Sequence, residues 1–470
     1  MRKQLKALLM TVALVTLSTG LIGCNNEKKQ QQTTTQVETT ENKVENNIEF
    51  KSDGEPVKDD SVLGKNTYVF SPTDNKDEIQ EKVSQIFARQ ESNQFGDERY
   101  ALLFKPGDYG TSLEINVGFY TQVLGLGILP TDTNINKLWV NADWMFHNAT
   151  CNFWRSAENF SVNDYCMWAN SQAVSLRRVN FNDGIVLSDG EGWSSGGFMA
   201  DCKVEKMVSS GSQQQYLFRN NNWGYFENGV WNMVFTGVNV DTIPTGGWPY
   251  EPYTKEETVP KIQEKPYLVY DEDNGYGVMV PEKRTECQGI SWENGVKGTF
   301  YSLNMFYVAD AQKDNADTIN KALKEGKNLL LTPGIYTLDK PITVEEKDTI
   351  IYGMGLATLV STNGNACMVT SDADGIKVCG VLFEAGDKQS ETLLKVGNEK
   401  AEVSHSDNPI CFSDVYFRVG GANYKGKVKN CVTINSNDVI GDNFWVWRAD
   451  HGDNVGWDMN TAPNGIVING

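Results

Sequence analysis

Apolar residues recur with a helical period in two short stretches of the chain and form strand-like runs elsewhere. In the later stretch Ile319, Ala322 and Leu323 lie on one helical face after Asp317. The earlier stretch starts at Asp77 and has the same character. We therefore expect two short amphipathic helices, each covering the exposed first edge of a stack of strands.

Each predicted helix begins a longer sequence repeat that occurs twice in the chain. A buried apolar run follows the helix, at 101–104 and again at 328–331. Pro-Gly then breaks the run into a tight turn, a Tyr begins the next strand at Tyr109 or Tyr336, and a Gly-x-Gly follows later. The repeat predicts two copies of one start module.

Short β-rich runs separated by Asn, Asp and Gly follow each start module. Residues 173–181 and 439–447 are examples, and helical periodicity is nearly absent outside the modules. This favours parallel β-helices over sandwiches, whose hairpin turns would recur more closely. We predict an all-β fold of two tandem right-handed parallel β-helices, at residues 61–242 and 301–470. Residues 243–300, rich in Pro and Tyr, should pack on both helices because their aromatics need burial.

The N-terminus has the three parts of an export signal. Residues 1–6 are cationic, Ala7 to Leu17 is apolar but too short to span a bilayer, and residues 21–24 resemble the lipobox of bacterial lipoproteins. We expect a signal peptide at 1–23 and lipid on Cys24, which would anchor the protein to the cell membrane, facing outward. The alternative is an ordinary secretory signal with a chance cysteine. Residues 24–60 have little to bury and predict a disordered tether.

Net charge and amino-acid composition restrict the classes of molecule that could bind this protein. The net charge is −19, and loss of the three basic residues of the signal brings it to about −22. This argues against nucleic acid or an anionic lipid surface as partner, and mildly against a polyanionic substrate. The 12 Trp suit a carbohydrate binder, although most could be core residues. No Cys/His metal spacing is present, so we predict no metal and no cofactor. We interpret the strand cysteines Cys202, Cys379, Cys411 and Cys431 as buried apolar residues rather than disulfide partners.

The doubled start module resembles that of the pectate-lyase-superfamily right-handed β-helix. Two such starts in one chain look like the twin β-helix of glycoside hydrolase family 55, whose members are exo-β-1,3-glucanases. The segments 118–127, 151–156 and 444–452 look like a bacterial group related to that family. The resemblance covers roughly residues 61–470. It implies a polysaccharide hydrolase that acts on β-glucan, with an active cleft between the two β-helices.

The sequence stops in a β-run, 465–470, with no helix or polar cap after it. We therefore expect the second β-helix to be incomplete at its C-terminal end. In the family the general acid is a carboxylate of the second helix. No matching motif is found here, which leaves open that the acid lies beyond residue 470.

Glycoside hydrolysis needs two carboxyl groups, or one acid and a positioned water. The densest candidate segment is 438–458, which mixes acids, aromatics, an Arg and a His. The predicted catalytic residues are Asp450, Asp453, Asp442 and Glu384. The predicted substrate-binding residues are Trp445, Trp447, Arg448, His451, Trp154 and Arg155.

Each of these assignments has a structural alternative. Trp445 and Trp447 share a strand face, and could be internal stacking residues rather than a sugar platform. Residues 450–453 could form an Asx-rich turn. Arg155 could be a buried residue that pairs with an acid to join coils. We interpret Asp414 and Arg418, on one strand face, as a structural ion pair.

Two rival functions remain open from the sequence. A calcium-dependent polysaccharide lyase uses the same fold, and Asp438, Asp442 and Arg448 could serve it. A non-catalytic carbohydrate-binding surface lipoprotein is the second. Reducing-sugar release from laminarin, compared with unsaturated products from pectin, would separate hydrolase from lyase.

Overall fold

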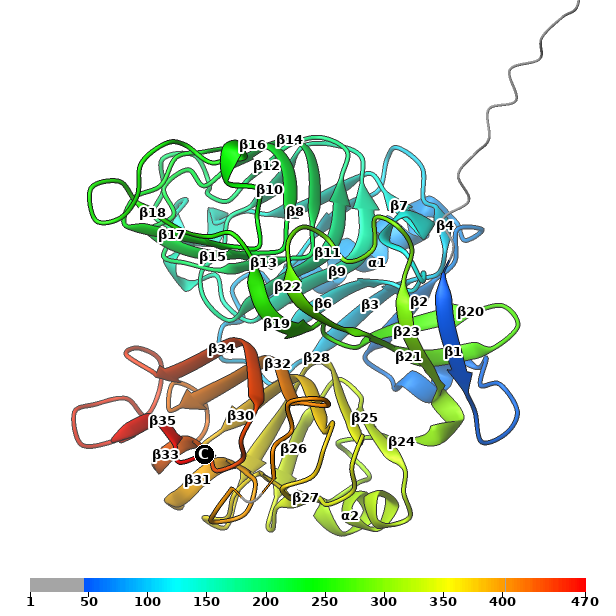
Figure 1. Ribbon diagram of the computed structural model, residues 1–470, viewed down its shortest axis with the longest axis vertical. Coiled ribbons are helices and arrows are strands. Elements are labelled where there is room, and N and C mark those ends of the chain that lie inside the picture. The colour runs from blue at the N-terminus through cyan, green and yellow to red at the C-terminus, as the bar shows by residue number, and fades with distance from the viewer. Residues whose placement is uncertain (1–45, 402) are drawn as a thin grey trace, which may run out of the picture. The chain divides into compact units, whose positions relative to one another are not determined.

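Parallel strand pairs dominate the computed structural model, which describes residues 46–401 and 403–470 (Figure 1). The predicted signal peptide, Cys24 and the predicted tether up to residue 45 lie outside the described residues. The strands form an N-terminal stack, a C-terminal stack and a middle segment between them in sequence. In the part of the chain that the structure describes, no helix combines the length and the apolarity needed to cross a bilayer.

The N-terminal stack is one 17-stranded sheet in which every strand pair is parallel. Its first helix, α1 (Lys76–Gln90), is capped by Asn75 and buries Ile79, Val83 and Ile86 at the end of the stack. Its strands are β2 (Thr67–Phe70), β3 (Tyr100–Phe104), β4 (Gly107–Asp108), β5 (Glu114–Asn116), β6 (Thr121–Gly125), β7 (Thr133–Ile135), β8 (Lys137–Val140), β9 (Arg155–Val162), β10 (Cys166–Trp168), β11 (Val174–Phe181), β12 (Ile185–Val186), β13 (Phe198–Ala200), β14 (Lys203–Ser209), β15 (Gln215–Arg219), β16 (Asn222–Glu227), β17 (Asn232–Thr236) and β18 (Tyr253–Glu256).

The C-terminal stack consists of two parallel sheets whose strands alternate in the chain. Helix α2 (Ala316–Lys324), capped by Asn315, packs Ile319 and Leu323 into its core. One sheet holds β24 (Phe306–Ala309), β25 (Asn328–Leu331), β26 (Ile335–Leu338), β28 (Ile350–Ser361), β30 (Lys377–Glu384), β32 (Ile410–Val419) and β34 (Val439–Arg448). The other holds β27 (Ile342–Val344), β29 (Met368–Thr370), β31 (Ser390–Val396), β33 (Val428–Ile434) and β35 (Asn464–Ile468).

Each predicted start module contains the expected helix, buried strand and Pro-Gly turn; Tyr336 lies in the next strand as predicted, whereas Tyr109 follows the short strand Gly107–Asp108. The Tyr109 hydroxyl donates to the carbonyls of Phe70 and Lys105, at 2.8 and 2.9 Å. The Tyr336 hydroxyl donates to the carbonyls of Ala309 and Thr332, at 2.8 and 3.0 Å. In both copies the Tyr therefore ties the Pro-Gly turn to the strand that precedes the helix, which explains why the phrase recurs.

Left-handed residues stack at one corner of successive coils. In the N-terminal stack Asn159, Arg178, Asp201 and Asn220 all have φ between 51° and 64°, and the strand registers place them in adjacent coils. In the C-terminal stack Gly380, Asp414 and Asn443 occupy the equivalent column, with φ of 70°, 53° and 71°. Asn, Asp and Gly tolerate this conformation best, and they fill six of these seven positions, Arg178 being the exception.

The middle segment packs on both stacks, as its aromatics predict. The strands β19 (Val259–Gln263) and β22 (Lys283–Cys287) form an antiparallel pair, and a four-stranded sheet contains β20 (Tyr267–Asp271), β21 (Gly275–Pro281) and β23 (Lys297–Ser302). One apolar cluster combines Leu103 and Leu124 of the N-terminal stack with Tyr276 and Val278 of this segment and Tyr352 of the C-terminal stack.

Two predicted boundaries shift in the structure. The fourth strand of the middle sheet is β1 (Asn47–Lys51), which pairs in parallel with β23. The predicted tether therefore ends too late, because residues 47–51 already belong to the sheet. The first stack continues to β18, beyond the predicted boundary at residue 242, because Met233 pairs with Tyr253.

The cysteines of the described residues are free. Cys202, Cys379, Cys411 and Cys431 are buried and make no disulfide, which confirms their interpretation as small apolar residues. The remaining helices are short 3₁₀ turns: Asp60–Leu63, Pro130–Asp132, Asp143–Met145, Ala149–Cys151, Val240–Thr242 and Leu303–Met305.

Candidate active site at the junction of the two stacks

Aromatic side chains from both stacks meet in one cluster, which we call the junction aromatic cluster. It contains Phe95, Phe119, Tyr120, Trp144, Phe153, Trp154, Tyr416, Trp445 and Trp447. Trp445 and Trp447 stack with ring centroids 5.2 Å apart and planes 13° apart, so the predicted shared face is observed. Phe153 of the N-terminal stack lies 4.9 Å from Trp445, and Phe95 stacks on Trp447 at 6.2 Å. The cluster therefore joins the stacks at β34.

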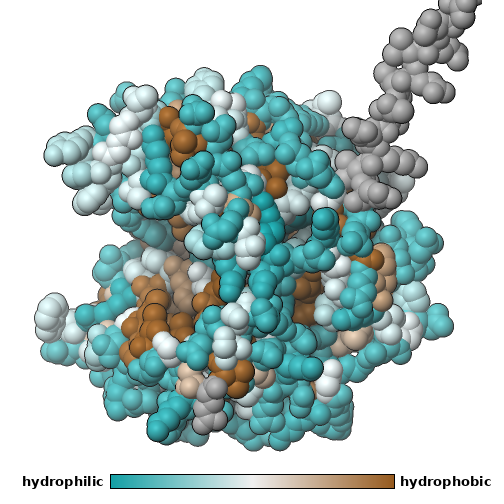
Figure 2. All heavy atoms as spheres, in the orientation of Figure 1, coloured by the Kyte–Doolittle hydropathy of each residue, from teal (hydrophilic) through white to brown (hydrophobic). Residues whose placement is uncertain are grey.

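Trp445 and Trp447 differ in exposure. Trp447 is only 9% exposed, whereas Trp445 is partly exposed and lines a hollow of about 280 Å³. Phe198 and Leu217 of the N-terminal stack form the opposite wall, with Asn443 and Phe444 beside Trp445. Figure 2 shows an apolar patch over β34 and its neighbours, below a notch between the two stacks. Of the two predicted Trp residues, Trp445 is thus the one with room for a sugar ring.

Trp154 and Arg155 are buried, and the Trp154 ring packs directly against Trp445, with centroids 5.1 Å apart. Arg155 donates to the carbonyls of Phe153 and Val117 at 3.0 and 2.8 Å, and its guanidinium lies over the Phe119 ring. Burial lowers the pKa of Arg155 to about 9. It holds carbonyls rather than an acid, so the alternative that it pairs with a carboxylate is wrong.

Arg448, Asp450, His451 and Asp453 belong to β34 and the loop that follows it. Arg448 donates to the carbonyls of Asn460, Gly456 and Trp457 and so fixes this loop. Asp450 is exposed and lies 2.6 Å from Nδ1 of His451, whose ring packs against Phe95 and Trp447.

These residues also border a second hollow. It measures about 360 Å³ and is lined by Arg448, Asp450 and the exposed Trp457. Asp453 pairs through its backbone with Gly421, and its side chain is exposed. Asp450 is therefore a predicted acid that lines a hollow, next to a histidine that packs on the aromatic cluster.

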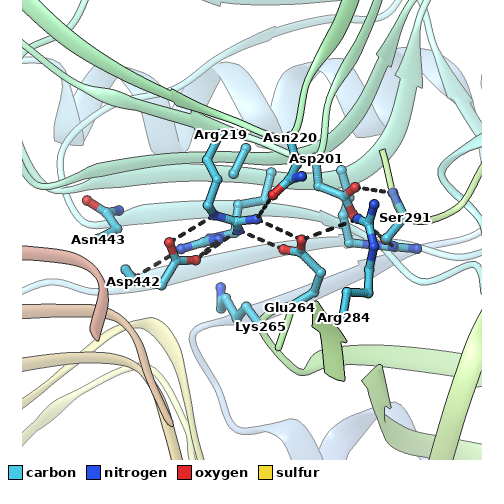
Figure 3. A network of polar contacts seen from close by, with 12 residues as sticks. Asp201, Arg219, Asn220, Glu264, Lys265, Arg284, Ser291, Asp442 and Asn443 are labelled. Carbon is cyan, nitrogen blue, oxygen red and sulfur yellow. Dashed lines mark hydrogen bonds and ion pairs between the residues drawn. The ribbon is translucent and has the colours of Figure 1, made fainter. Parts of the chain in front are cut away.

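Asp442 belongs to a buried charge network between the stacks (Figure 3). Its carboxylate pairs with Arg177 at 2.7 Å and with Arg219 at 2.9 Å. Arg219 also pairs with Glu264 of the middle segment at 2.7 Å. Burial alone would raise the pKa of Asp442, but the two guanidinium groups outweigh it and lower the pKa. A carboxylate held in this way keeps its charge and does not donate a proton.

The network continues through Asp414, which corrects one prediction. Asp414 pairs with Arg177 at 2.8 Å and with Lys265 at 3.1 Å, and not with Arg418. Its positive φ turns the strand there, so alternation along β32 does not hold. Arg418 instead pairs at 2.8 Å with Glu384, its register partner in the neighbouring coil. Glu384 is 1% exposed, and Arg418 contacts both of its oxygens.

Sequence reasoning missed the basic half of this network. Arg177 and Arg219 lie in apolar strands, and Lys265 follows the strand β19. A charged residue inside an apolar run is rarely buried without a partner, so Arg177 in the run 173–181 was a usable signal.

One group of side chains among the described residues has ligand atoms close enough for a metal ion. Asp143, His147 and Asp189 place ligand atoms within 4.8 Å of one another. Asp143 and His147 are exposed, and Asp189 already accepts from the Ala142 amide at 2.9 Å. His147 lies 3.1 Å from Asp189, and this contact raises the pKa of the imidazole. The group is explained by these contacts alone.

Comparison with known proteins points to one family. Residues 306–470 match the model of the LAM55 pectate lyase-like domain. A protein of Streptomyces sp. (strain SirexAA-E / ActE) named exo-β-1,3-glucanase is 46% identical over 414 residues, which are 87% of this chain and 67% of the relative.

Solved structures agree with this match. The structure of sacteLam55A from Streptomyces sp. SirexAA-E superposes with a TM-score of 0.83 at 44% identity, over 88% of this chain and 75% of that one. A variant of sacteLam55A in complex with glucose, in which alanine replaces one glutamate, gives a TM-score of 0.84 at 45% identity over the same shares. With its parallel strand stacks and this degree of identity, the chain belongs to glycoside hydrolase family 55.

Proposed function

We propose that this protein is a glycoside hydrolase that releases glucose from the ends of β-1,3-glucan chains. The observation that carries the proposal is the 46% identity, over most of both chains, to a protein named exo-β-1,3-glucanase. The glucose complex of a similar structure supports a glucan as substrate. The aromatic character of the stack junction adds physical support, since Trp rings pack well on the apolar faces of sugar rings.

We place substrate binding at the junction of the two stacks, beside Trp445. The hollow there has walls from both stacks and a partly exposed indole. Trp447, more deeply buried, supports Trp445 from below by stacking. Arg448 holds the loop that carries Asp450 and Asp453. The junction therefore supplies a sugar platform and nearby acids.

Among the predicted acids, Asp450 is our preferred candidate for a role in hydrolysis. A glycosidase acid must protonate the departing oxygen, and a second carboxylate or a positioned water completes the reaction. Asp450 borders the hollow of about 360 Å³ and is free of Lys and Arg partners within the described residues. Asp442 and Glu384 are held by arginines, and Asp453 does not line the hollow, so we rank them lower.

We further propose that each stack is a right-handed parallel β-helix. In the C-terminal stack successive strands alternate between two sheets from β26 onward, as a coiled path requires. Right-handed crossovers join parallel strands in nearly all proteins. This geometry places the start helices at corresponding ends of the two coils.

We also propose that lipid on Cys24 holds the protein outside the cell, where polymeric glycans are found. The sequence 21–24 and the short apolar run before it support this. Expression with a palmitate analogue should label the wild type and not Cys24→Ala, and the variant should appear in the medium. Equal labelling of both proteins would contradict the anchor.

The reaction is tested by the products of the full chain on two polymers. Incubation with laminarin should release glucose, detected with a glucose-specific assay. Incubation with pectin should give no rise in the absorbance of unsaturated sugars. Unsaturated products from pectin, without glucose from laminarin, would favour the lyase and overturn the proposal.

A further inference from the structure

Three polar side chains form a row of hydrogen bonds where the two stacks meet. Gln94 belongs to the loop after α1 in the N-terminal stack, whereas Asp450 and His451 follow β34 in the C-terminal stack. Nε2 of Gln94 lies 2.6 Å from Nε2 of His451, and Nδ1 of His451 lies 2.6 Å from Oδ1 of Asp450. We call these three residues the junction row. It connects the N-terminal stack to the acid that we prefer for hydrolysis.

The direction of these hydrogen bonds follows from the chemistry of the groups. The amide nitrogen of Gln94 can only donate, so Nε2 of His451 accepts. A neutral imidazole carries one proton, and that proton is then on Nδ1. An ionised carboxylate can only accept, so Nδ1 donates to Asp450. Each donor of the junction row therefore meets an acceptor, and His451 is held as the Nδ1–H tautomer.

Gln94 is buried, and backbone contacts fix its position. The residue is 8% exposed. Its backbone amide donates to the Ser92 carbonyl at 2.9 Å, and its carbonyl accepts from the Tyr120 hydroxyl at 2.6 Å. A buried amide left without a partner costs about 1–3 kcal/mol, so the hydrogen bond with His451 favours this one arrangement of the side chain.

The next residue, Phe95, packs the same loop onto the C-terminal stack. Its ring stacks on Trp447 and meets the His451 ring edge-on, with centroids 5.6 Å apart. A Cβ at Gly421 would lie 2.8 Å from the Phe95 ring, and a Cβ at Gly452 would lie 2.6 Å from it. The two glycines therefore leave the space that this ring fills, and this fit brings the neighbouring Gln94 to His451.

Asp450 is the member of the junction row that lies at the proposed site. Its side chain lines the hollow of about 360 Å³ and is 79% exposed. An exposed carboxylate samples several rotamers, and the hydrogen bond from a fixed ring to Oδ1 reduces this freedom. Oδ2 makes no hydrogen bond within the described part of the chain, so it is available to a sugar hydroxyl or a water.

We propose that Gln94 is a positioning residue, which acts through His451 to hold Asp450 at the hollow. The proposal rests on the proposed hydrolysis at the junction and adds to it a contribution from the N-terminal stack. Because Gln94 is buried behind His451, its removal should slow the reaction more than it weakens substrate binding.

Nuclear magnetic resonance of ¹⁵N-labelled His shows which ring nitrogen carries the proton in the full chain. The chain has three His, and the loss of signals in His451→Gln assigns His451. The spectra are recorded at about pH 8.5, well above the usual pKa of histidine. Asp450 also favours a proton on Nδ1, so the contribution of Gln94 is measured in Asp450→Ala.

Nδ1 of His451 should stay protonated in Asp450→Ala, because the Gln94 amide still occupies Nε2. When Gln94→Leu is added, the proton should move to Nε2, the form that a free imidazole prefers. Gln85→Leu, at an exposed amide on α1, is the matched control and should leave the proton on Nδ1.

The rate of glucose release from laminarin tests whether the reaction uses this contact. Gln94→Leu should lower kcat at least about fivefold and change KM by less than about twofold. Gln94→Asn, which keeps the amide but is too short to reach His451, should have the same effect. In His451→Gln, the addition of Gln94→Leu should cause no further loss, because Gln94 acts through the ring. Melting curves identify a variant that does not fold, and Gln94→Asn then decides.

Any of three results would overturn the proposal: a proton on Nε2 of His451 in Asp450→Ala, an unchanged kcat in both Gln94 variants, or losses in kcat that multiply when Gln94→Leu is added to His451→Gln. A wild type that releases no glucose would instead contradict the proposed reaction. The spectra of Asp450→Ala would in that case still decide whether Gln94 holds His451.

Discussion

Asp442 and Trp445 lie three residues apart on β34 but meet different surroundings. The carboxylate is buried among two arginines, and the indole faces a hollow. Asn443 separates them with φ of 71°, and its amide donates to the Val174 carbonyl and to Asp414. The charge network therefore anchors the strand that presents the aromatic residues.

Removal of one charged partner from this network should lower the stability of the protein. Asp442→Ala leaves Arg177 and Arg219 buried with less compensation, so we expect a loss of about 3–5 kcal/mol in the free energy of unfolding. Urea unfolding followed by fluorescence measures it. Asp450→Ala, at an exposed acid in the same part of the chain, should change stability by less than about 0.5 kcal/mol. Equal effects of the two variants would show that the network contributes little.

His405 should link stability to pH. Its ring is buried, with Nδ1 2.6 Å from Asp374 and Nε2 3.0 Å from Asp372, so both nitrogens need a proton. Burial disfavours the protonated ring, but the contacts with the two carboxylates have the larger effect and raise the pKa of His405. Protonated His405 therefore stabilises the fold fully at pH values below its unfolded pKa of about 6.5. This stabilisation is lost as the pH rises through the pKa of His405 in the folded protein.

We therefore expect the difference in melting temperature between the wild type and His405→Gln to be largest near pH 5.5 and to shrink towards pH 9. Differential scanning calorimetry at several pH values measures it. His147→Gln, at an exposed imidazole that contacts the buried Asp189, is the comparison and should show a smaller change with pH. A difference that stays constant with pH would contradict the assignment of a charged His405.

At the scale of elements, the corner columns determine how coils stack. Gly380 has φ of 70°, and a Cβ there would lie 2.4 Å from the Gly353 carbonyl oxygen in the adjacent coil. Gly441 is the matched contrast, since a Cβ there meets only the Phe444 ring at 3.4 Å. Replacement by Ala adds the same methyl group at both glycines, so a difference in stability between the two variants reflects their positions.

Gly380→Ala should destabilise the protein by about 2–4 kcal/mol, from left-handed strain and from the clash with the next coil. Gly441→Ala should change stability by less than about 1 kcal/mol. Melting temperatures of the two variants measure the contrast. Similar values would mean that the corner column does not constrain the stack.

The elements show where sequence reasoning succeeds. The start modules were predictable because a helical period, Pro-Gly and a following Tyr are local signals, and the structure gives Tyr109 and Tyr336 the same contacts. β1 was missed, because Asn47–Lys51 is short, follows a long polar stretch, and pairs with β23 some 250 residues later. The charge network was missed for the same reason, since Arg177 and Asp442 meet only through the fold.

The candidate site was likewise predictable from the sequence only in part. The stacking of Trp445 on Trp447 follows from their spacing in a strand, and it was expected. The partners Phe95 and Phe153 come from the other stack, so no local pattern could indicate them. Likewise the ion pairs of Asp442 and Glu384 depend on residues in other coils, which is why both acids looked available in the sequence.

In the whole molecule, the two stacks contact each other through a buried charge network and through an apolar aromatic cluster. The charge network joins Arg177 and Arg219 to Asp414, Asp442 and Glu264, and the junction aromatic cluster lies further along β34. The buried charges fix the register between the stacks, because they find partners only in one alignment. The hollow beside Trp445 is thereby held open between walls that belong to different parts of the chain.

Glucose release from laminarin by the wild type and by Trp445→Ala tests this account most directly. We predict that the wild type releases glucose and that Trp445→Ala lowers kcat/KM at least tenfold, which is about 1.4 kcal/mol of transition-state binding, while its melting curve shows that the variant is still folded at the assay temperature. Trp193→Ala, at an exposed Trp outside the junction cluster, should match the wild type. A wild type that releases no glucose, or a Trp445→Ala variant as active as Trp193→Ala, would contradict it.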